Sequence, residues 1–331
     1  MPTKTVAGRT WHFSHSVGHH VGPGGFVHPT SVLATPDNIV YVADTGAAEG
    51  YGRARIRKLH IEDGFIDDFG TRDLVWPEGL AIDHLGNIYC SDARTHQIVV
   101  HDQNGEEINA WGSYGAEAGQ LNGPSGLVVD NDNSLLVADT RNHRIQKFST
   151  DGSAIDSWGT FGDAPGQLNR PWGLTIDQAG DVYVADWGND RVQKFSSEGE
   201  LLGQFGSTID DGGQLTRPSD VAVDSEGDVY VADWGNHRIQ IYYPDGDIIC
   251  GLYGDAREFS RSAQEVMDVN PDLVAAFDRV EPTELVSWGH FERPRGIAID
   301  DQDRIIVTDG TRGRFQVYAK DKDYIVPQFN L

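Results

Sequence analysis

The chain has 331 residues, and 51 acidic against 26 basic side chains give a formal net charge of -25 at pH 7. A chain this acidic is repelled by phosphate backbones and by anionic membrane surfaces, which argues against nucleic acid and against a membrane as partners. No stretch approaches the roughly 20 apolar residues of a membrane helix, so we expect a soluble, cytoplasmic protein.

A repeated segment opens with proline at a constant step of 47 residues, at Pro77, Pro124, Pro171 and Pro218. Each segment has a short apolar run, a turn rich in Asp, Gly and Asn, a second apolar run that ends in Asp, and two further runs. The segments HPTSVLATPDNIVYVAD and RPRGIAIDDQDRIIVTD bring the number of units to six. Four short antiparallel strands make one propeller blade, and blades must pack around an axis to bury both of their faces.

The sequence therefore predicts one domain over residues 1–331, an all-β six-bladed β-propeller of four-stranded antiparallel blades with a short helical insertion between blades five and six. We expect an N-terminal strand at residues 6–14 to complete blade six, although residues 324–329 compete for this place. The last strand of blade five lies at residues 247–254 or at 284–289, and the second choice would move the insertion to the opposite face. The blades are expected near residues 28–71, 76–113, 123–160, 170–207, 217–255 and 293–329, with the insertion at 256–287.

Charged residues that recur in every unit are expected to serve the fold. An aspartate ends each second strand, and an arginine begins the third strand about five residues later in most blades. We expect these charges to pair with one another or to cap turns. The arginines are Arg55, Arg144, Arg191, Arg238 and Arg314.

The stretches ADTRNHRIQKF, ADWGNDRVQKF and ADWGNHRIQIY resemble NHL repeats, and the resemblance extends from His28 to Ala319. It implies a six-bladed propeller, whereas a fold alone does not define an activity. Among related propellers, the amidating lyases hold zinc with histidines directly after the opening prolines. This chain has no histidine at those positions, so that zinc site is not carried over.

Two other groups of related propellers imply different functions. Gluconolactonase-like propellers hold calcium or zinc with Glu, Asn and Asp around the channel; Glu78 in WPEGL resembles their first ligand, and Asp220 is a candidate for a second. NHL domains of tripartite-motif proteins bind RNA or protein on the channel face, and the negative charge of this chain disfavours RNA.

Residues that differ between blades at equivalent positions need an explanation other than folding. In a propeller of this strand order, the residue after each opening proline and the loop after each second strand lie at the mouth of the central channel. Aromatic and cationic side chains around a cavity suit an anionic or carbonyl-bearing small molecule. The candidates for ligand binding are Arg94, Arg141, Trp172, Trp187, Asp220, Trp234 and Arg312.

Histidines gather where blades six and one become neighbours in the ring. His19, His20, His28 and His290 would meet there, and such a cluster binds a divalent metal or acts as a general base, although no HExxH spacing is present. A glycine-rich insertion in blade one contains Tyr51, a further ligand-binding candidate. We expect this insertion and residues 256–287 to form a partial lid over blades five, six and one.

These observations predict a small-molecule hydrolase or lyase with its site at the channel mouth. Glu78 would act as a base or as a ligand of a divalent metal such as zinc or calcium, Arg295 would hold an anionic group, and His28 or His290 would transfer a proton. The alternative is a non-enzymatic propeller that binds a ligand or a protein partner, for which we expect a broad exposed apolar patch on the same face.

Overall fold

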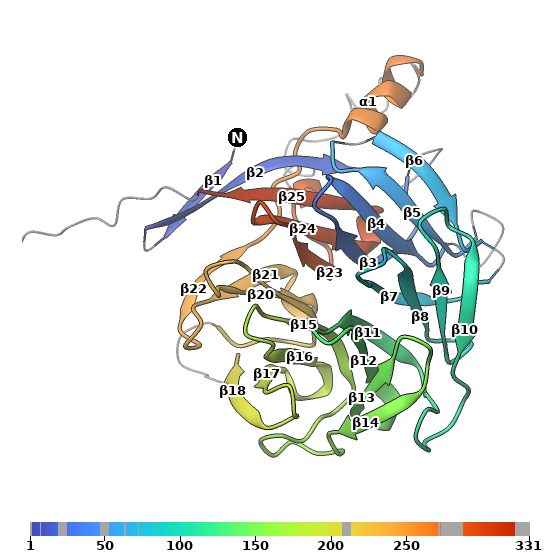
Figure 1. The fold of residues 1–331 in the computed structure, drawn as a ribbon. Helices are drawn as coiled ribbons and strands as arrows, with labels where there is room; N and C mark the ends of the chain where they lie inside the picture. Colours follow the sequence, from blue (N-terminus) through green and yellow to red (C-terminus); the bar gives the residue numbers. More distant parts are fainter. Residues whose placement is uncertain are drawn as a thin grey trace, which may run out of the picture.

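The computed structural model describes residues 2–6, 8–18, 25–46, 53–62, 64–71, 73–206, 213–270, 272 and 287–321. Six antiparallel sheets stand side by side around a central axis, with their first strands innermost (Figure 1). The all-β six-bladed propeller predicted from the repeats is confirmed. No helix in the described ranges is long and apolar enough to cross a membrane.

The first three blades each consist of four strands in simple sequential order. Blade one holds β3 (Pro29–Ala34), β4 (Ile39–Asp44), β5 (Arg55–His60) and β6 (Gly64–Phe69). Blade two holds β7 (Pro77–Ile82), β8 (Ile88–Asp92), β9 (Gln97–His101) and β10 (Glu107–Trp111). Blade three holds β11 (Pro124–Val129), β12 (Ser134–Asp139), β13 (Arg144–Ser149) and β14 (Ala154–Trp158).

Blades four and five repeat this order, and blade six departs from it. Blade four holds β15 (Pro171–Ile176), β16 (Val182–Asp186), β17 (Arg191–Phe195) and β18 (Leu201–Phe205). Blade five holds β19 (Pro218–Val223), β20 (Val229–Asp233), β21 (Arg238–Tyr242) and β22 (Ile248–Leu252), so its fourth strand is the earlier of the two candidates. Blade six holds β23 (Pro294–Ile299), β24 (Arg304–Asp309) and β25 (Arg314–Lys320), followed by two N-terminal strands.

The apolar core lies between neighbouring blades rather than inside any one of them. Tyr183 and Phe205 of blade four pack with Val221 and Val231 of blade five, and five equivalent clusters fill the other junctions of the ring. The second strand of a blade is covered on both faces, so every residue of β16 is buried. Because each sheet buries its faces only against two neighbours, the six sheets stabilise one another as a closed ring.

The recurring charges form the expected framework. In blade three, Nε of Arg144 donates to Oδ2 of Asp139 at 2.8 Å, and the Asp139 carboxylate is fully buried. The same ion pair recurs in four other blades, and each arginine then reaches backbone carbonyls of the preceding linker where the structure describes them. The equivalent pairs are Arg55–Asp44, Arg191–Asp186, Arg238–Asp233 and Arg314–Asp309.

The N-terminus completes blade six. Strand β2 (Arg9–Val17) pairs antiparallel with β25, and β1 (Thr3–Val6) adds a fifth strand outside it. The observed strand begins and ends about three residues later than the predicted 6–14, because its register is set by pairing of Trp11 with Lys320. The competing residues 324–329 lie outside the described residues.

Ring closure also depends on contacts from blade six to blade five. The Lys320 ammonium lies 2.6 to 2.8 Å from carboxylate oxygens of Asp224, Glu226 and Asp228, and Nη2 of Arg9 donates to Asp228 at 2.9 Å. Nε1 of Trp11 donates to the Tyr230 hydroxyl at 3.1 Å. The last and the first strands are therefore both tied to the same turn of blade five.

The insertion between blades five and six contains α1 (Arg261–Asp268), as predicted. Ser260 caps this helix by accepting from the N–H of Ala263, and its hydroxyl donates to the carbonyl of Gly18. Figure 1 shows α1 projecting from the outer rim of the ring beside β6. The described part of the insertion thus does not form the predicted lid, and residues 47–52 of the blade-one insertion, including Tyr51, lie outside the described residues.

Candidate functional site

Four of the linkers between blades are each fixed to an earlier blade by one side chain whose backbone is left-handed. Nδ1 of His96 accepts the N–H of Gly123 at 2.9 Å, and Nδ1 of His143 accepts the N–H of Arg170 at 3.1 Å. His96 and His143 have φ values of 61° and 57°. The same bond recurs between Asp190 and Arg217 at 2.7 Å and between His237 and Arg293 at 3.3 Å.

The arginines that precede the opening prolines are themselves left-handed. Arg170 and Arg217 have φ values of 56° and 52°, a conformation that few residues other than glycine adopt. Their guanidinium groups lie over the ring of Trp187, with Cζ 5.9 Å and 5.0 Å from the ring centroid. The strained backbone therefore places two cations against one aromatic side chain at the junction of blades four and five.

Blade three reaches a similar arrangement with different residues. Gly123 stands where blades four, five and six have arginine, with a φ of 62°. A Cβ at Gly123 would lie 3.2 Å from Nε of Arg141, so the Arg141 side chain occupies the space that opens beside this glycine. A guanidinium group therefore faces the mouth in blade three as well, although it comes from the loop after the second strand.

These side chains line a cavity of about 730 Å³ at the channel mouth, over blades two, three and four, which we call the mouth pocket. In the part of the chain that the structure describes, the guanidinium groups of Arg94, Arg141 and Arg170 have no ion pair or hydrogen bond. Glu78 is the only carboxylate in the described lining. The other lining residues are Trp76, Ala93, His96, Gly123, Ser125, Thr140, His143, Trp172, Trp187 and Arg295.

Glu78 and Arg295 meet across the channel, although their blades are not neighbours. Nη2 of Arg295 donates to Oε2 of Glu78 at 2.9 Å, and Nε1 of Trp76 donates to Oε1 at 2.6 Å. Cζ of Arg295 also lies 5.7 Å from the ring centroid of Trp172 in blade four. The three side chains Glu78, Trp172 and Arg295 line both the mouth pocket and the channel below it, so they separate the two spaces.

The channel itself is a second cavity of about 350 Å³, lined by the first strands of the blades. Asp220 stands in it where most blades have glycine. Its carboxylate accepts the N–H of Ile297 in blade six at 3.0 Å and that of Val221 at 2.9 Å. A Cβ at Gly173 would collide with Asp220, so this glycine makes room for the carboxylate. Burial raises the pKa of Asp220 to about 7.

His96 and His143 add two neutral donors to the mouth pocket. Partial burial, followed by the nearby Arg141 cation, lowers the pKa of His96, and partial burial followed by the Arg170 cation lowers the pKa of His143. Because Nδ1 of each ring accepts a backbone N–H, the neutral ring carries its proton on Nε2. Each imidazole can therefore donate a hydrogen bond from Nε2.

Matches to known families follow the blades. Residues 215–242 and 291–318 match the NHL repeat, and they span three strands each of blades five and six. Residues 115–208 match the SMP-30/gluconolactonase/LRE-like region, which covers blades three and four. Blades five and six therefore carry NHL repeats. No functionally curated protein matches it.

Solved structures with the same fold include lyases and a lactonase. A streptogramin B lyase has a TM-score of 0.59 and 11% identity, over 96% of this chain and 100% of that one. A catalytically inactive virginiamycin B lyase from Staphylococcus aureus, solved with quinupristin, has a TM-score of 0.57 and 12% identity, over 93% and 99%. A gluconolactonase from Xanthomonas campestris has a TM-score of 0.59 and 14% identity, over 94% and 99%. At these identities the likeness shows the fold alone.

The propeller brings part of the predicted site together. Glu78, Arg94, Arg141, Trp172, Trp187 and Arg295 all line the mouth pocket, and Asp220 lies in the channel beneath it. Trp234 is displaced to the next junction, where Cζ of Arg293 lies 4.7 Å from its ring centroid. Arg312 is engaged by the carbonyl of Ser287 at 3.0 Å and by Glu292 at 3.6 Å.

The predicted histidines lie away from the mouth pocket where the structure describes them. His28 is exposed, and its Nδ1 lies 3.4 Å from the carbonyl of Gly310. His290 is exposed as well, and its carbonyl accepts from Arg314. His19 and His20 lie outside the described residues. The described side chains therefore place the mouth pocket on blades two to four, with His28 and His290 on the other side of the ring.

The sequence analysis did not select eight of the lining residues, and the four of these with aromatic or cationic side chains are Trp76, His96, His143 and Arg170. His143 lies between an asparagine and an arginine, and Arg170 precedes an opening proline, and both patterns recur in several blades. Recurring residues are explained by the fold, so contrast between blades does not select them. The available signal is that these positions lie in the linkers and loops of the mouth face. A recurring residue there both holds the blades together and lines the cavity.

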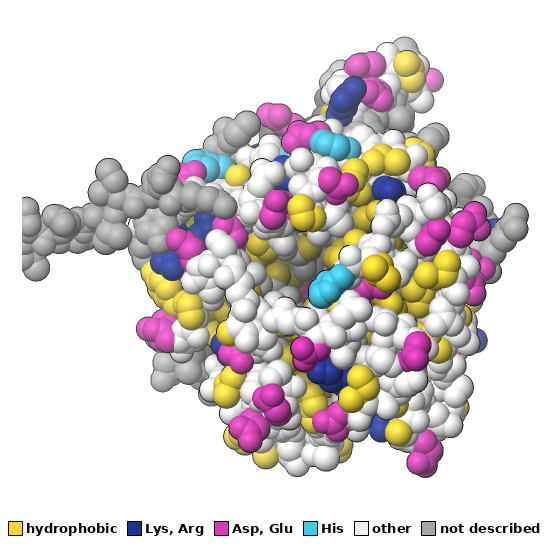
Figure 2. Space-filling model, viewed as in Figure 1, with side chains coloured by type: hydrophobic (Ala, Val, Ile, Leu, Met, Phe, Trp, Pro, Cys, Tyr) yellow, Lys and Arg dark blue, Asp and Glu magenta, His cyan; other side chains and the backbone are white. Residues whose placement is uncertain are grey.

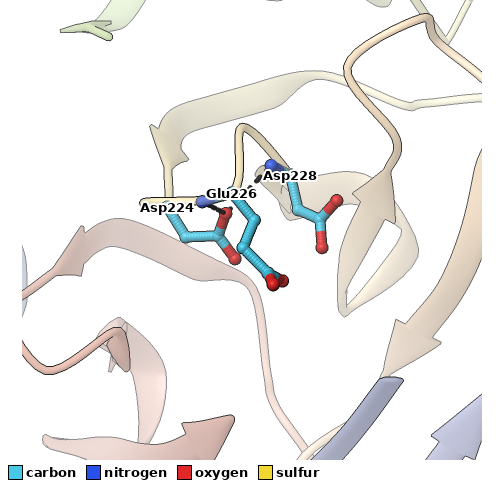
Figure 3. A group of neighbouring side chains, drawn as sticks. All are labelled: Asp224, Glu226 and Asp228. Atoms are coloured by element: carbon cyan, nitrogen blue, oxygen red, sulfur yellow. Dashed lines mark hydrogen bonds between the residues drawn. The ribbon is translucent and has the colours of Figure 1, made fainter. Parts of the chain in front are cut away.

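Among the described residues, one group of three carboxylates lies close enough together to hold a metal ion. This group lies away from the mouth pocket. Figure 3 shows Asp224, Glu226 and Asp228 around one turn of blade five. The Lys320 ammonium already contacts all three, and it occupies the position that a cation would take. At the mouth, Glu78 is engaged by Trp76 and Arg295, so the described residues there do not fit a metal held by several carboxylates or histidines.

Proposed function

We propose that this propeller is a hydrolase or lyase that acts on a small anionic molecule in the mouth pocket. The observation that carries the proposal is the gathering of Arg94, Arg141, Arg170 and Arg295 around one cavity, in a chain whose net charge is -25. Acidic side chains are scattered over the surface in Figure 2, with fewer basic ones among them. A local excess of cations on an otherwise acidic surface makes this cavity the favoured place for an anion.

The dimensions and lining of the mouth pocket suit a small molecule with an apolar body. Its volume of about 730 Å³ lies within the range of ligand sites. Arg141 and Arg170 are free to form bidentate bonds with a carboxylate or phosphate, and Trp76 and Trp172 provide apolar walls. Trp76 is 49% exposed, which leaves much of its surface available to a ligand.

The same lining offers groups for bond cleavage. Nε2–H of His96 or His143 is suited to donate to a leaving group or to a developing oxyanion. Glu78 is the candidate base, because an anion that takes its place on Arg295 would free its carboxylate. The lyases and the gluconolactonase among the similar structures support this class of reaction without indicating the substrate.

The test compares chromogenic compounds that differ in charge. We expect the protein to bind and cleave p-nitrophenyl glucuronide or p-nitrophenyl phosphate, and to leave neutral p-nitrophenyl glucoside untouched. Arg141→Gln and Arg170→Gln should each weaken binding at least about tenfold. Arg261→Gln is the matched control, because Arg261 is an exposed arginine on α1. Equal binding of the neutral glucoside, or equal loss in the control, would contradict the proposal.

Exposed aromatic side chains favour a second candidate, a propeller that binds without catalysis. Tyr114 and Phe161 are 69% and 66% exposed, and their rings contact those of His96 and His143 at a tilt and edge-on, with 5.0 Å and 4.6 Å between ring centroids. Exposed aromatic rings of this kind are typical of binding surfaces. Arginine-dependent binding of both anionic compounds without cleavage of either would favour this candidate over the enzyme.

A further inference from the structure

A second cavity adjoins the mouth pocket at the junction of blades four and five. This side pocket has a volume of about 510 Å³, and His143, Arg170 and Trp187 line it as well as the mouth pocket. Phe161 and Arg217 are among the residues that only the side pocket contains. Because the two cavities share these side chains, one elongated ligand can lie in both.

The side pocket has its own cations. The guanidinium groups of Arg170 and Arg217 lie over Trp187, and neither forms an ion pair or hydrogen bond within the described part of the chain. The carboxylate of Asp190 also lines the side pocket, and its Oδ1 accepts the backbone N–H of Arg217 at 2.7 Å. Two cations against one engaged carboxylate leave the side pocket able to bind a second anionic group.

The residues at and beside the two cavities repeat from blade to blade. One unit consists of His96, the Tyr114 ring that contacts it at a tilt, and the nearby Arg141. The next unit consists of His143, the Phe161 ring that contacts it edge-on, and the nearby Arg170. Each unit presents an exposed aromatic ring and a free guanidinium group, with Arg217 following as a further cation. A surface that repeats in this way is complementary to a ligand that repeats.

We propose that the ligand is a short acidic oligosaccharide with one carboxylate on each sugar ring, seated along the mouth pocket and the side pocket. The inference rests on the proposed function and names its substrate class. Sugar rings present apolar C–H faces to aromatic side chains, and their carboxylates fit the fork of a guanidinium group. A short chain fits because the guanidinium groups of Arg141, Arg170 and Arg217, which form no ion pair or hydrogen bond within the described residues, line these two adjoining cavities. The overall charge also repels a long polyanion.

The experiment is calorimetric titration with galacturonate and with trigalacturonate. The intact protein should bind trigalacturonate at least about tenfold more tightly than galacturonate, because the longer chain also reaches the side pocket. Arg217→Gln should remove most of this advantage and leave galacturonate binding unchanged. Arg141→Gln should weaken both ligands, and Arg261→Gln should weaken neither. Thermal unfolding of each variant checks that the propeller is intact.

Each other outcome overturns the inference in a recognisable way. If galacturonate binds through Arg141 but trigalacturonate binds no more tightly, or binds equally to Arg217→Gln, the side pocket is not a subsite and the proposed function stands. Equal binding of neutral maltotriose would refute the role of charge. If oligouridylate binds more tightly than trigalacturonate and its binding depends on Arg217, the mouth pocket and the side pocket are a site for single-stranded RNA. If neither uronate binds while p-nitrophenyl phosphate does, the substrate class is wrong and the mouth pocket remains.

Discussion

Arg295 of blade six reaches over the channel to Glu78 of blade two, with 2.9 Å between Nη2 and Oε2. The arginine is 22% exposed and the carboxylate 5% exposed at their side chains, so the pair lies at the border between the mouth pocket and the channel. Its position gives it two roles, to neutralise a buried carboxylate and to offer a cation to an anionic ligand.

These two roles can be separated by substitution. Arg295→Met leaves the Glu78 carboxylate with Trp76 as its remaining described side-chain partner, and the free energy of unfolding should fall by about 2 kcal/mol. The double variant Glu78→Gln/Arg295→Met should recover most of this loss, because no buried charge remains, while binding of p-nitrophenyl glucuronide stays weak in both. Urea denaturation and calorimetry measure the two effects. Recovery of binding along with stability would show that Arg295 acts only on the fold.

His143 should make stability depend on pH. Its pKa is lowered in the folded protein from an ordinary value of 6.5, so the unfolded chain binds the proton more readily. Stability should therefore be lost as pH falls below 6.5 and through the folded pKa. In His143→Asn the side-chain oxygen can still accept the N–H of Arg170, as Asp190 does for Arg217, and the part of this loss that comes from His143 should be absent. Denaturation at about pH 5 and about pH 8 compares the two, and a His143 pKa above 6.5 by NMR would contradict the expectation.

Asp220 should have the opposite dependence. Burial raises its pKa from 3.8 to about 7, so the folded state favours the neutral acid. Its contribution to stability is complete below 3.8 and is lost as pH rises toward 7. Asp220→Asn cannot ionise, and it should be more stable relative to the parent at about pH 8 than at about pH 5. An unchanged difference between the two proteins across this range would mean that Asp220 titrates normally in the channel.

Lys320 should be worth more to the fold than a comparable surface lysine. Burial alone would lower its pKa, but hydrogen bonds to Asp224, Asp228 and Glu226 raise it, so the ammonium stays charged in the cage. Lys320→Met leaves two buried carboxylates without this cation, and the free energy of unfolding should fall by about 3 kcal/mol. Lys147→Met is the control, because Lys147 pairs with Asp130 at a more exposed position and should cost about 1 kcal/mol or less. Equal losses would show that the Lys320 cage contributes no more to stability than a more exposed ion pair.

Repetition made the fold predictable. Asp139 and Arg144 recur with the same spacing in most blades. Because the two charges must pair when they are buried, neither residue can vary alone, and the repeat stays visible in the sequence. The N-terminal closure was predictable for a related reason, because the stretch HSVGHHVGPGGFVHP that follows this strand resembles the linkers GSYGAEAGQLNGP and GTFGDAPGQLNRP. Its register was not predictable, since it depends on the pairing of Trp11 with Lys320 near the other end of the chain.

The candidate site was only partly predictable. Contrast between blades selected Glu78, Trp172 and Arg295, whose side chains differ from their counterparts and do meet at the channel. The same contrast passed over Arg170 and His143, because they recur. It also favoured His28 and His290, whose crowding in the sequence says nothing about the direction of their side chains. Which sector of the mouth holds a cavity depends on loop conformation, such as the left-handed backbone of Arg170, and this cannot be read from composition.

The most direct test of the account is a crystal structure of the Glu78→Gln variant, which lacks the candidate base, soaked with p-nitrophenyl glucuronide. The account predicts density in the mouth pocket, with the carboxylate within hydrogen-bond distance of Arg141 or Arg170 and the aryl ring against Trp76 or Trp172. A glucuronide bound only elsewhere on the surface, or a mouth pocket without density at a saturating concentration, would contradict it.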